Sequence, residues 1–249
     1  MSIILKSEQE IELMRRAGQI VATVLEKLNS EVRPGITTQE LDNIALKEVT
    51  RLGGIPSFKG YRGYPANICV SINEEIVHGI PDQRVLKVGD VVSIDFGAIY
   101  KGFQGDAALT VGVGKLDTKA DKLLTTTEGA LKAGIDASRT GARLGDVSHA
   151  IQEYVESRGF AVIREYTGHG IGRDMHEDPQ IPNFGNIGQG PVLKTGMTFA
   201  LEPKVTTGDW RTKVAGNHWT VSTLDGSLAA HYEHTIAITN GAARVLTVL

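Results

Sequence analysis

The segment "VVSIDFGAIYKGFQGDAALTV" (residues 91–111) sets two carboxylates into a predicted β-hairpin. Its first half is apolar and rich in β-formers, and Tyr100-Lys101-Gly102 supplies turn chemistry before a second short strand. If the first two of these turn residues form the loop, Asp95 faces Asp106 directly across the strands. If the last two form it, the acids lie diagonally on one face, and a three-residue loop would separate them.

Two carboxylates on facing strands repel each other, and an apolar neighbourhood makes this worse. Neither strand carries a cation placed to neutralise them. A shared proton, an arginine from elsewhere in the chain or a bound cation could compensate, and a divalent metal ion would remove the repulsion outright. From this segment alone, two solvated acids on an edge hairpin are the simpler interpretation.

The composition predicts a protein that folds alone and works in a reducing compartment. With 249 residues, 41% of them apolar, the chain can bury a substantial core as a single domain, residues 1–249. A net charge of −3 and scattered basic residues give no footprint for nucleic acid or anionic membrane. A single cysteine excludes an internal disulfide, and neither a leader nor a membrane-spanning apolar run is recognisable. We therefore expect a cytoplasmic protein.

The sequence contains an internal repeat of its predicted elements. Capping-box patterns at residues 7–10 and 37–40 each begin an amphipathic helix. After the hairpin the same order returns, with helices predicted at about 118–137 and at 144–158. An offset of 106 residues, which sets Arg33 on Arg139, aligns the two helix pairs.

A strand match extends the repeat. "LKVGDVVSIDFG" from Leu86 aligns with "LKTGMTFALEPK" from Leu193, one residue out of phase, so that Asp95 corresponds to Glu202. The fold class is therefore predicted as α+β, with pairs of helices on a central antiparallel sheet and two halves, roughly 7–111 and 117–239, related by a pseudo-twofold axis.

The second half should also carry a hairpin. In "WTVSTLDGSLAAHYEHTIAIT" (residues 219–239), Asp225-Gly226 is the predicted turn and Glu233 lies in the return strand. Four acids then converge near the axis: Asp95, Asp106, Glu202 and Glu233. Four buried acids without a cation are costly, so a metal site becomes the better interpretation.

One histidine stands out from the seven. In "YTGHGIGRDMHEDP", His169 is flanked by glycines, which permit a close backbone approach, and His176 follows after a short loop. One imidazole with four carboxylates is a hard, oxygen-rich ligand set, suited to two divalent ions such as cobalt, manganese, iron or zinc. Residue type alone gives no functional role to the remaining candidates: His149, His218, His231 and His234.

The motifs "IDFG", "GFQGDAA", "GHGIGRDMHEDP", "FALEP" and "YEHT" together resemble the type I methionine aminopeptidases of the pita-bread fold. The resemblance spans nearly the whole chain and includes "YRGYPANICVSINEEIVHGIP" (residues 61–81). It implies a dinuclear-metal aminopeptidase that hydrolyses N-terminal methionine through a metal-bridging water or hydroxide.

For the metal ligands, the resemblance implies that Asp95 chelates one ion and that Asp106 and Glu233 bridge both. His169 and Glu202 would complete the shell of the other ion. Glu202 is also implied to be catalytic, taking and returning protons around the bridging water.

For the substrate, the resemblance implies that His176 hydrogen-bonds the scissile amide and that His78 holds the substrate backbone, which makes both catalytic and substrate-binding residues. The implied methionine pocket is formed by Tyr61, Tyr64, Cys69, Trp219 and Met175. Plain core packing is a serious alternative for Tyr64 and Cys69, and a turn residue is the alternative for His78. Met175, Phe58 and Arg62 depart from residues common in relatives, so we expect an altered pocket rim.

The implied partners are nascent polypeptide N-termini whose second residue is small, with the ribosome as a candidate contact and a monomer as the expected state. Three other functions share parts of this pattern. A proline-specific peptidase shares the five ligands but usually carries an extra domain, and a non-catalytic protein-binding member tends to have lost ligands. A glycosidase would leave His169 unexplained.

Overall fold

The computed structural model describes residues 2–249, and its four α-helices begin at or within a residue of the predicted starts. The helices are α1 (Glu8–Glu31), α2 (Thr38–Arg51), α3 (Thr118–Ala137) and α4 (Leu144–Glu156). Ser7 and Thr37 each close a capping box with the glutamate three residues on, which satisfies backbone N–H groups that the first turn leaves free. The two predicted helix pairs are thereby confirmed.

Fifteen strands form three antiparallel sheets among the described residues. The large sheet has the order β1-β4-β5-β14-β9-β7-β8, with β2 on β4 and β15 on β14. The smaller sheets are β13-β10-β6 and β11-β12-β3. The strands are β1 (Ile55–Pro56), β2 (Cys69–Ile72), β3 (Glu75–Val77), β4 (Val91–Tyr100), β5 (Phe103–Gly112), β6 (Ala161–Val162), β7 (Gly168–Gly170), β8 (Glu177–Ile181), β9 (Thr198–Leu201), β10 (Lys204–Thr206), β11 (Thr212–Val214), β12 (Val221–Thr223), β13 (Ala229–His231), β14 (Glu233–Ile238) and β15 (Ala243–Val245).

The register of β4 on β5 selects one of the three hairpin loops that the sequence allows. Tyr100 pairs with Phe103, so the loop is Lys101-Gly102, and both loop residues have positive φ, 48° and 79°. Such a loop matches the strand twist and needs a residue without a Cβ penalty at its second position. The shift places Asp95 and Asp106 diagonally on one face.

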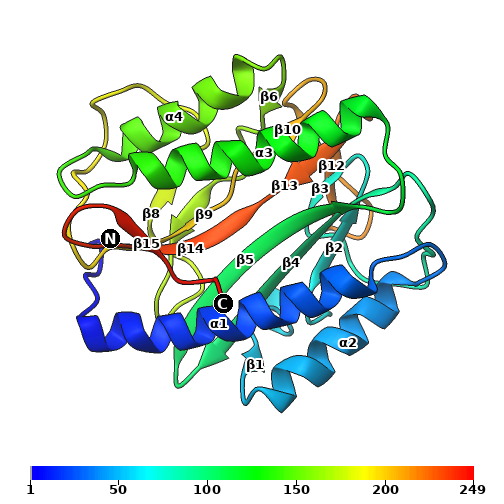
Figure 1. The fold of residues 1–249 in the computed structure, drawn as a ribbon, viewed down its shortest axis with the longest axis horizontal. Helices are drawn as coiled ribbons and strands as arrows, with labels where there is room; N and C mark the ends of the chain where they lie inside the picture. Colours follow the sequence, from blue (N-terminus) through cyan, green and yellow to red (C-terminus); the bar gives the residue numbers. More distant parts are fainter. Residues whose placement is uncertain (1) are drawn as a thin grey trace.

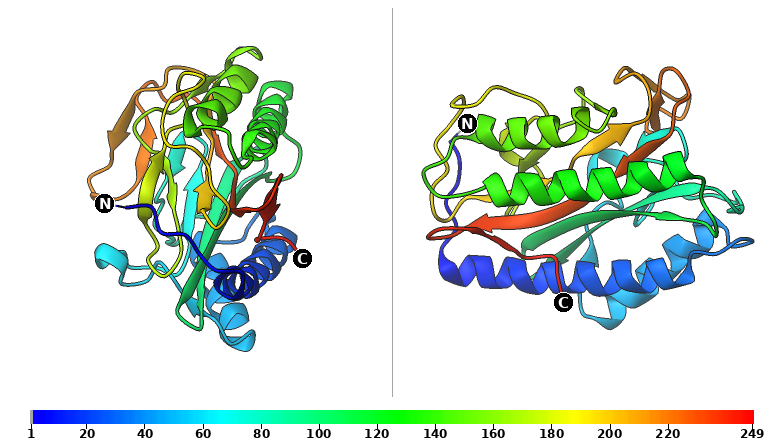
Figure 2. Two further views of the ribbon diagram at one scale, coloured as in Figure 1. Left: turned by 90° about the vertical axis from the view of Figure 1, so that its left-hand side faces the viewer. Right: turned by 45° about the horizontal axis from the view of Figure 1, so that its top comes forward.

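The helices cover one face of the large sheet (Figures 1 and 2). Strand alternation sends Val92, Ile94 and Phe96 into the core beneath α1 and α2, so that Asp95 points to the opposite face. The helices α3 and α4 cover the β9–β14 half of the sheet through a second core. The helix-free face is therefore where polar side chains gather.

The predicted hairpin at 219–239 is wrong. Its first strand, β12, pairs with β11 and β3, whereas β13 pairs with β10, and β14 joins the large sheet. The turn at Asp225 is held locally, because its carboxylate accepts from the backbone N–H groups of Asp209 and Ser227. In the large sheet β14 lies between β5 and β9, which brings Glu233 beside the strand that leads to Glu202.

The two central strands of the large sheet, β5 and β14, pair with each other. The Thr235 hydroxyl links them further, since it accepts from the Asp106 N–H and donates to the Asp106 carbonyl. The sheets of the two helix pairs therefore join centrally, as the repeat predicts. Within residues 2–249, no helix has both the length and the apolarity to cross a bilayer.

Candidate metal centre

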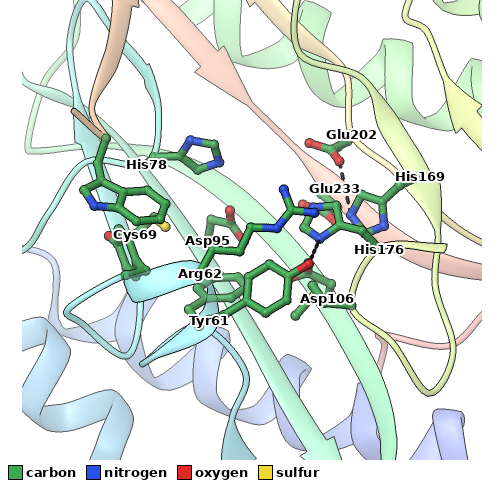
Figure 3. Close-up of a pocket in the computed structure, with 14 residues that line it drawn as sticks. Tyr61, Arg62, Cys69, His78, Asp95, Asp106, His169, His176, Glu202 and Glu233 are labelled. Carbon is green, nitrogen blue, oxygen red and sulfur yellow. Dashed lines mark hydrogen bonds and ion pairs between the residues drawn. The ribbon is translucent and has the colours of Figure 1, made fainter. Parts of the chain in front are cut away.

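The four predicted acids converge on the helix-free face of the sheet (Figure 3). Asp95 and Asp106 come from the β4–β5 hairpin, Glu233 begins β14, and Glu202 follows β9. Asp106 is 4% exposed and Glu233 only 2%. Acids so completely removed from water need a compensating charge or a proton.

Burial, followed by the charge of Glu233, raises the pKa of both Asp95 and Asp106 well above the usual range. Burial raises the pKa of Glu233 to about 7, against the opposing effect of Lys204. An oxygen of Asp95, of Asp106 and of Glu233 is buried without a hydrogen-bond partner among the described residues. Buried carboxylate oxygens without a hydrogen-bond donor destabilise the fold, and a bound cation would remove this cost.

The Nε2 atom of His169 faces the acids and can bind a metal ion. Its Nδ1 lies 2.8 Å from the Gly170 carbonyl oxygen, so a proton on Nδ1 is used there and Nε2 keeps its lone pair. Nε2 is 3.5 Å from Glu202 Oε1. Burial, then His176, lowers the pKa of His169 to about 3, so the ring is neutral at physiological pH.

The glycines around His169 serve close packing of strands. A Cβ on Gly168 would lie 2.5 Å from the Ala200 carbonyl oxygen, and one on Gly170 would lie 2.2 Å from that of Asp178. The close approach predicted from the glycine pattern is therefore made by neighbouring backbone. It fixes His169 against β8 and β9.

Two residues that the sequence did not single out, Lys204 and His231, contact the acids. Lys204, 2% exposed, makes an ion pair with Glu202 Oε2, and His231 Nε2 lies 3.4 Å from Glu233 Oε2. Burial lowers the pKa of Lys204 to about 8, against the opposing effect of the acids. Their spacing in the sequence could have revealed them. Lys204 lies two residues after Glu202 and His231 two residues before Glu233, and in an extended chain residues two apart point to the same side.

The donor set fits divalent metal ions. Donor atoms of Asp106, His169 and Glu233 lie within 4.8 Å of one another, as do those of Asp95, His231 and Glu233. Oxygen donors with one or two imidazoles suit ions of the manganese, iron, cobalt or zinc type. Lys204 offsets one of the four negative charges at most, so the remaining acids still need a bound cation or protons.

His176 stands beside the cluster on the segment after β7. Its ring lies 4.2 Å from that of His169, and its Nδ1 is 2.8 Å from the Tyr61 hydroxyl (Figure 3). Burial, then the Arg62 charge, lowers the pKa of His176 to about 4. The neutral ring can donate a hydrogen bond without introducing a further cation.

His78 flanks the cluster on the side away from His176 (Figure 3). Its backbone has a positive φ of 59°, and the next residue is Gly79, where a Cβ would lie 2.1 Å from the Val70 carbonyl oxygen. Burial, followed by Lys204, lowers the pKa of His78 to about 4. The loop that carries His78 therefore passes close to the backbone of β2.

All twelve predicted site residues border one cavity of about 140 Å³, together with Phe58 and Arg62. Its apolar end is built from Tyr64 and Cys69, whose packing includes Trp219 and Phe58. The Tyr64 hydroxyl reaches the Gly79 carbonyl oxygen at 2.9 Å, so this ring both packs in a core and lines the cavity. Tyr64 and Cys69 therefore pack in a small core and line the cavity at the same time, so the two interpretations of these residues are compatible.

Gly97, directly opposite Asp106 in the hairpin, leaves room for two side chains that line the cavity. A Cβ there would lie 2.9 Å from each of Met175 Cε, Phe58 Cε1 and Ser57 Cβ. Met175 and Phe58 therefore fill the space that a side chain at position 97 would take. Both differ from the residues that are common at these positions in relatives. Arg62, the third, stands at the rim with its guanidinium 5.3 Å from the Tyr61 ring.

The chain matches known proteins over almost its full length. Residues 12–240 match the model of metallopeptidase family M24. A methionine aminopeptidase of Clostridium acetobutylicum is 51% identical over 246 residues, covering 98% of each chain. The crystal structure of a methionine aminopeptidase from Thermotoga maritima has a TM-score of 0.99 at 49% identity, covering 100% of each chain.

A more distant likeness supports the fold alone. A prolidase from Pyrococcus furiosus has a TM-score of 0.81 at 22% identity, and the match covers 99% of this chain but 66% of the prolidase. The central antiparallel sheet with its helix pairs is the pita-bread fold that these structures share. The resemblance drawn from the motifs is confirmed, and the chain belongs to metallopeptidase family M24 and, within it, to the methionine aminopeptidases.

Proposed function

We propose that this chain is a dinuclear-metal aminopeptidase that removes the N-terminal methionine from nascent proteins and peptides when the second residue is small. The observation that carries the proposal is the set of unpartnered buried oxygens on Asp95, Asp106 and Glu233, aimed into a cavity with an apolar end. Methionine aminopeptidases about 50% identical over the full chain support the reaction.

The metal ligands in this proposal are Asp95, Asp106, His169, Glu202 and Glu233, with two divalent ions of cobalt, manganese, iron or zinc. Asp106 and Glu233 would be shared, with Asp95 on one side and His169 and Glu202 on the other. When bound, the ions would polarise the scissile carbonyl and lower the pKa of a water molecule. The neutral imidazole of His169 and the unpaired oxygens support this assignment.

The chain's own residues then handle protons and orientation. Glu202 would take a proton from the attacking water and return it to the leaving amine. The Tyr61 hydroxyl lies 2.8 Å from Nδ1 of His176, and in the tautomer where it donates, the ring proton on Nε2 would stabilise charge that develops on the carbonyl oxygen. His78 would hold the peptide backbone on the opposite side.

Substrate selection would follow from the cavity. The methionine side chain would enter the apolar end, where thioether and aromatic groups make favourable contacts. The proposed pocket residues are Tyr61, Tyr64, Cys69, Trp219 and Met175. A bulky second residue would collide with the rim, and the loss of a few kcal/mol in transition-state contacts suffices for strong discrimination.

We further infer that residues 1–249 act as one catalytic domain, a monomer in the cytoplasm, with roughly symmetric halves at 7–111 and 117–239. Its partners would be nascent N-termini, with the ribosome as a candidate contact, and neither nucleic acid nor membrane. The net charge of −3 and the absence of basic runs from the sequence support this proposal.

Peptide cleavage tests the function. Metal-loaded protein is incubated with Met-Ala-Ser, Met-Leu-Ser and Ala-Pro peptides, and released amino acids are quantified. We expect free methionine from Met-Ala-Ser and little from Met-Leu-Ser. Cleavage of the Ala-Pro peptides alone would replace the proposal with a proline-specific peptidase.

A further inference from the structure

Lys6 and Glu177 form a buried ion pair outside the acid cluster. Lys6 comes directly before Ser7, the residue that caps α1, and Glu177 is the first residue of β8. Their side chains are only 4% and 5% exposed, and Nζ of Lys6 contacts Oε2 of Glu177. The cost of removing two charges from water largely cancels their attraction, so such a pair adds little net stability. Its main consequence is therefore the geometry that it holds.

The Glu177 carboxylate closes the loop that carries His176. Its Oε1 accepts from the backbone N–H of Arg173 at 3.0 Å and from that of Asp174 at 3.4 Å. The loop, residues 171–176, joins β7 to β8, and His176 is its last residue. Because consecutive Cα atoms are only about 3.8 Å apart, the carboxylate that closes the loop also sets the backbone position from which His176 reaches the cavity.

Lys6 holds this carboxylate from the N-terminal segment, and it is itself anchored. Its backbone N–H donates to the Gly196 carbonyl oxygen at 2.7 Å, and its Nζ donates to the Ile4 carbonyl oxygen at 3.2 Å. A Cβ on Gly172 would lie 2.3 Å from Lys6 Cε and 2.4 Å from Glu177 Oε1. The backbone of the loop therefore packs directly on the ion pair.

The His176 ring has contacts of its own. Its Nδ1 lies 2.8 Å from the Tyr61 hydroxyl, and its ring centroid lies 4.2 Å from that of His169. These contacts orient the ring, whereas Lys6 and Glu177 act on the backbone that carries it. Neither member of the ion pair borders the cavity of about 140 Å³, so an effect on the reaction would have to pass through the loop.

We propose that Lys6 is a positioning residue: its ion pair with Glu177 holds the 171–176 loop so that His176 meets the scissile carbonyl. The inference rests on the proposed function and deepens it, because it assigns a residue outside the cavity to the same reaction.

Kinetics of methionine release from Met-Ala-Ser by metal-loaded protein test the proposal first. Lys6→Met keeps an apolar side chain but leaves the Glu177 carboxylate buried and unpaired, whereas Lys6→Met/Glu177→Gln leaves no unpaired charge. Both should lower kcat about tenfold, since a small misplacement of a reacting group is costly, and should change KM by less than about twofold. The control Lys27→Met breaks an exposed ion pair with Glu31 on α1 and should behave as wild type.

The double variant separates positioning from stability. We expect Lys6→Met/Glu177→Gln to unfold at a higher temperature than Lys6→Met, because it buries no unpaired charge, while kcat stays low. Recovery of wild-type kcat together with stability would overturn the proposal. If Lys6→Met does not fold, the double variant alone carries the test.

The His176→Ala background shows whether Lys6 acts through His176. Once the imidazole is gone, Lys6→Met should lower kcat by less than about twofold further, because the group that it positions is absent. The same tenfold loss in both backgrounds would indicate a general structural effect and would overturn the proposal.

Imidazole NMR signals give a readout that does not depend on activity. In protein supplied with diamagnetic Zn²⁺, the His176 ring signals are assigned by their loss in His176→Ala. We expect them to shift or broaden in Lys6→Met and in the double variant, while those of His149 on α4 stay in place. Unchanged His176 signals would overturn the proposal. Failure of wild type to release methionine would instead refute the proposed function, and the ring signals would still decide whether Lys6 positions His176.

Discussion

Asp95 and Asp106 lie diagonally across the β4–β5 hairpin, with Ala108 directly opposite the first and Gly97 directly opposite the second. The small partners leave both carboxyl groups room to meet on one face, where burial raises the pKa of each. This geometry presents two acids to a common point. It is the structural basis for treating Asp106 as a shared ligand.

Asp106→Asn should keep the fold but lose at least one metal ion and nearly all turnover, because an amide oxygen is a poor substitute for a bridging carboxylate. Metal content by mass spectrometry and methionine release from Met-Ala-Ser measure both effects. The exposed Asp121→Asn is the control and should behave as wild type. Two ions bound at full occupancy in Asp106→Asn would contradict the bridging role.

Gly97→Ala should narrow the cavity. The new Cβ would meet Met175 Cε and Phe58 Cε1 at 2.9 Å, so these side chains must shift. We expect KM for methionine peptides to rise several-fold and stability to fall by about 1–3 kcal/mol, the range for overpacked cores. Gly216→Ala, with open space around its Cβ, is the control. An unchanged KM would argue that position 97 does not shape the pocket.

His176→Ala should lower kcat by roughly 10²-fold or more with a smaller effect on KM, as expected when a donor to developing charge is removed. Tyr61→Phe keeps the stacked ring and removes only the hydroxyl that contacts His176 Nδ1. It should cost far less, about a few-fold. Equal losses in the two variants would mean that the hydroxyl, and with it the ring tautomer, carries the effect.

His234 should make stability depend on pH. Burial lowers its pKa from 6.5 to about 4, and its Nδ1 lies 2.8 Å from the Thr247 hydroxyl. Between pH 6.5 and about 4, His234 is therefore protonated in the unfolded chain and neutral in the folded protein. Stability from the neutral ring is present above pH 6.5 and is lost as pH falls toward 4, by up to about 3 kcal/mol.

Urea unfolding of wild type and His234→Gln between pH 7 and pH 4 measures this contribution, since terms common to both proteins cancel in the difference. The stability of wild type should fall more steeply than that of the variant. Parallel curves would show that His234 does not titrate in this range.

The sequence predicts the local elements well because their signals are local. Ser7 and Thr37 cap helices through contacts three residues away, and the apolar period fixes the helix faces. The five-ligand pattern was likewise visible as motifs. The sequence leaves the hairpin register open, and the structure shows a Lys101-Gly102 loop in which Gly102 takes the positive φ of the second position.

The sequence could not predict which strands pair at long range. Asp225-Gly226 has the composition of a hairpin turn, yet β12 and β13 enter different sheets because their partners are distant segments of the chain. The same limit concealed the contacts of Lys204 and His231 with the acids, because these contacts depend on β10 lying beside β13. Their spacing from Glu202 and Glu233 was a usable signal that residue type alone did not reveal.

The central claim is that the buried acids are tolerated because divalent ions bind among them. Anomalous diffraction at the manganese absorption edge, from crystals of the protein grown with Mn²⁺, tests it directly. We predict two peaks that share Asp106 and Glu233, one also bound by Asp95 and the other by His169 and Glu202. Absence of any peak within bonding distance of Asp106 and Glu233 would contradict the account.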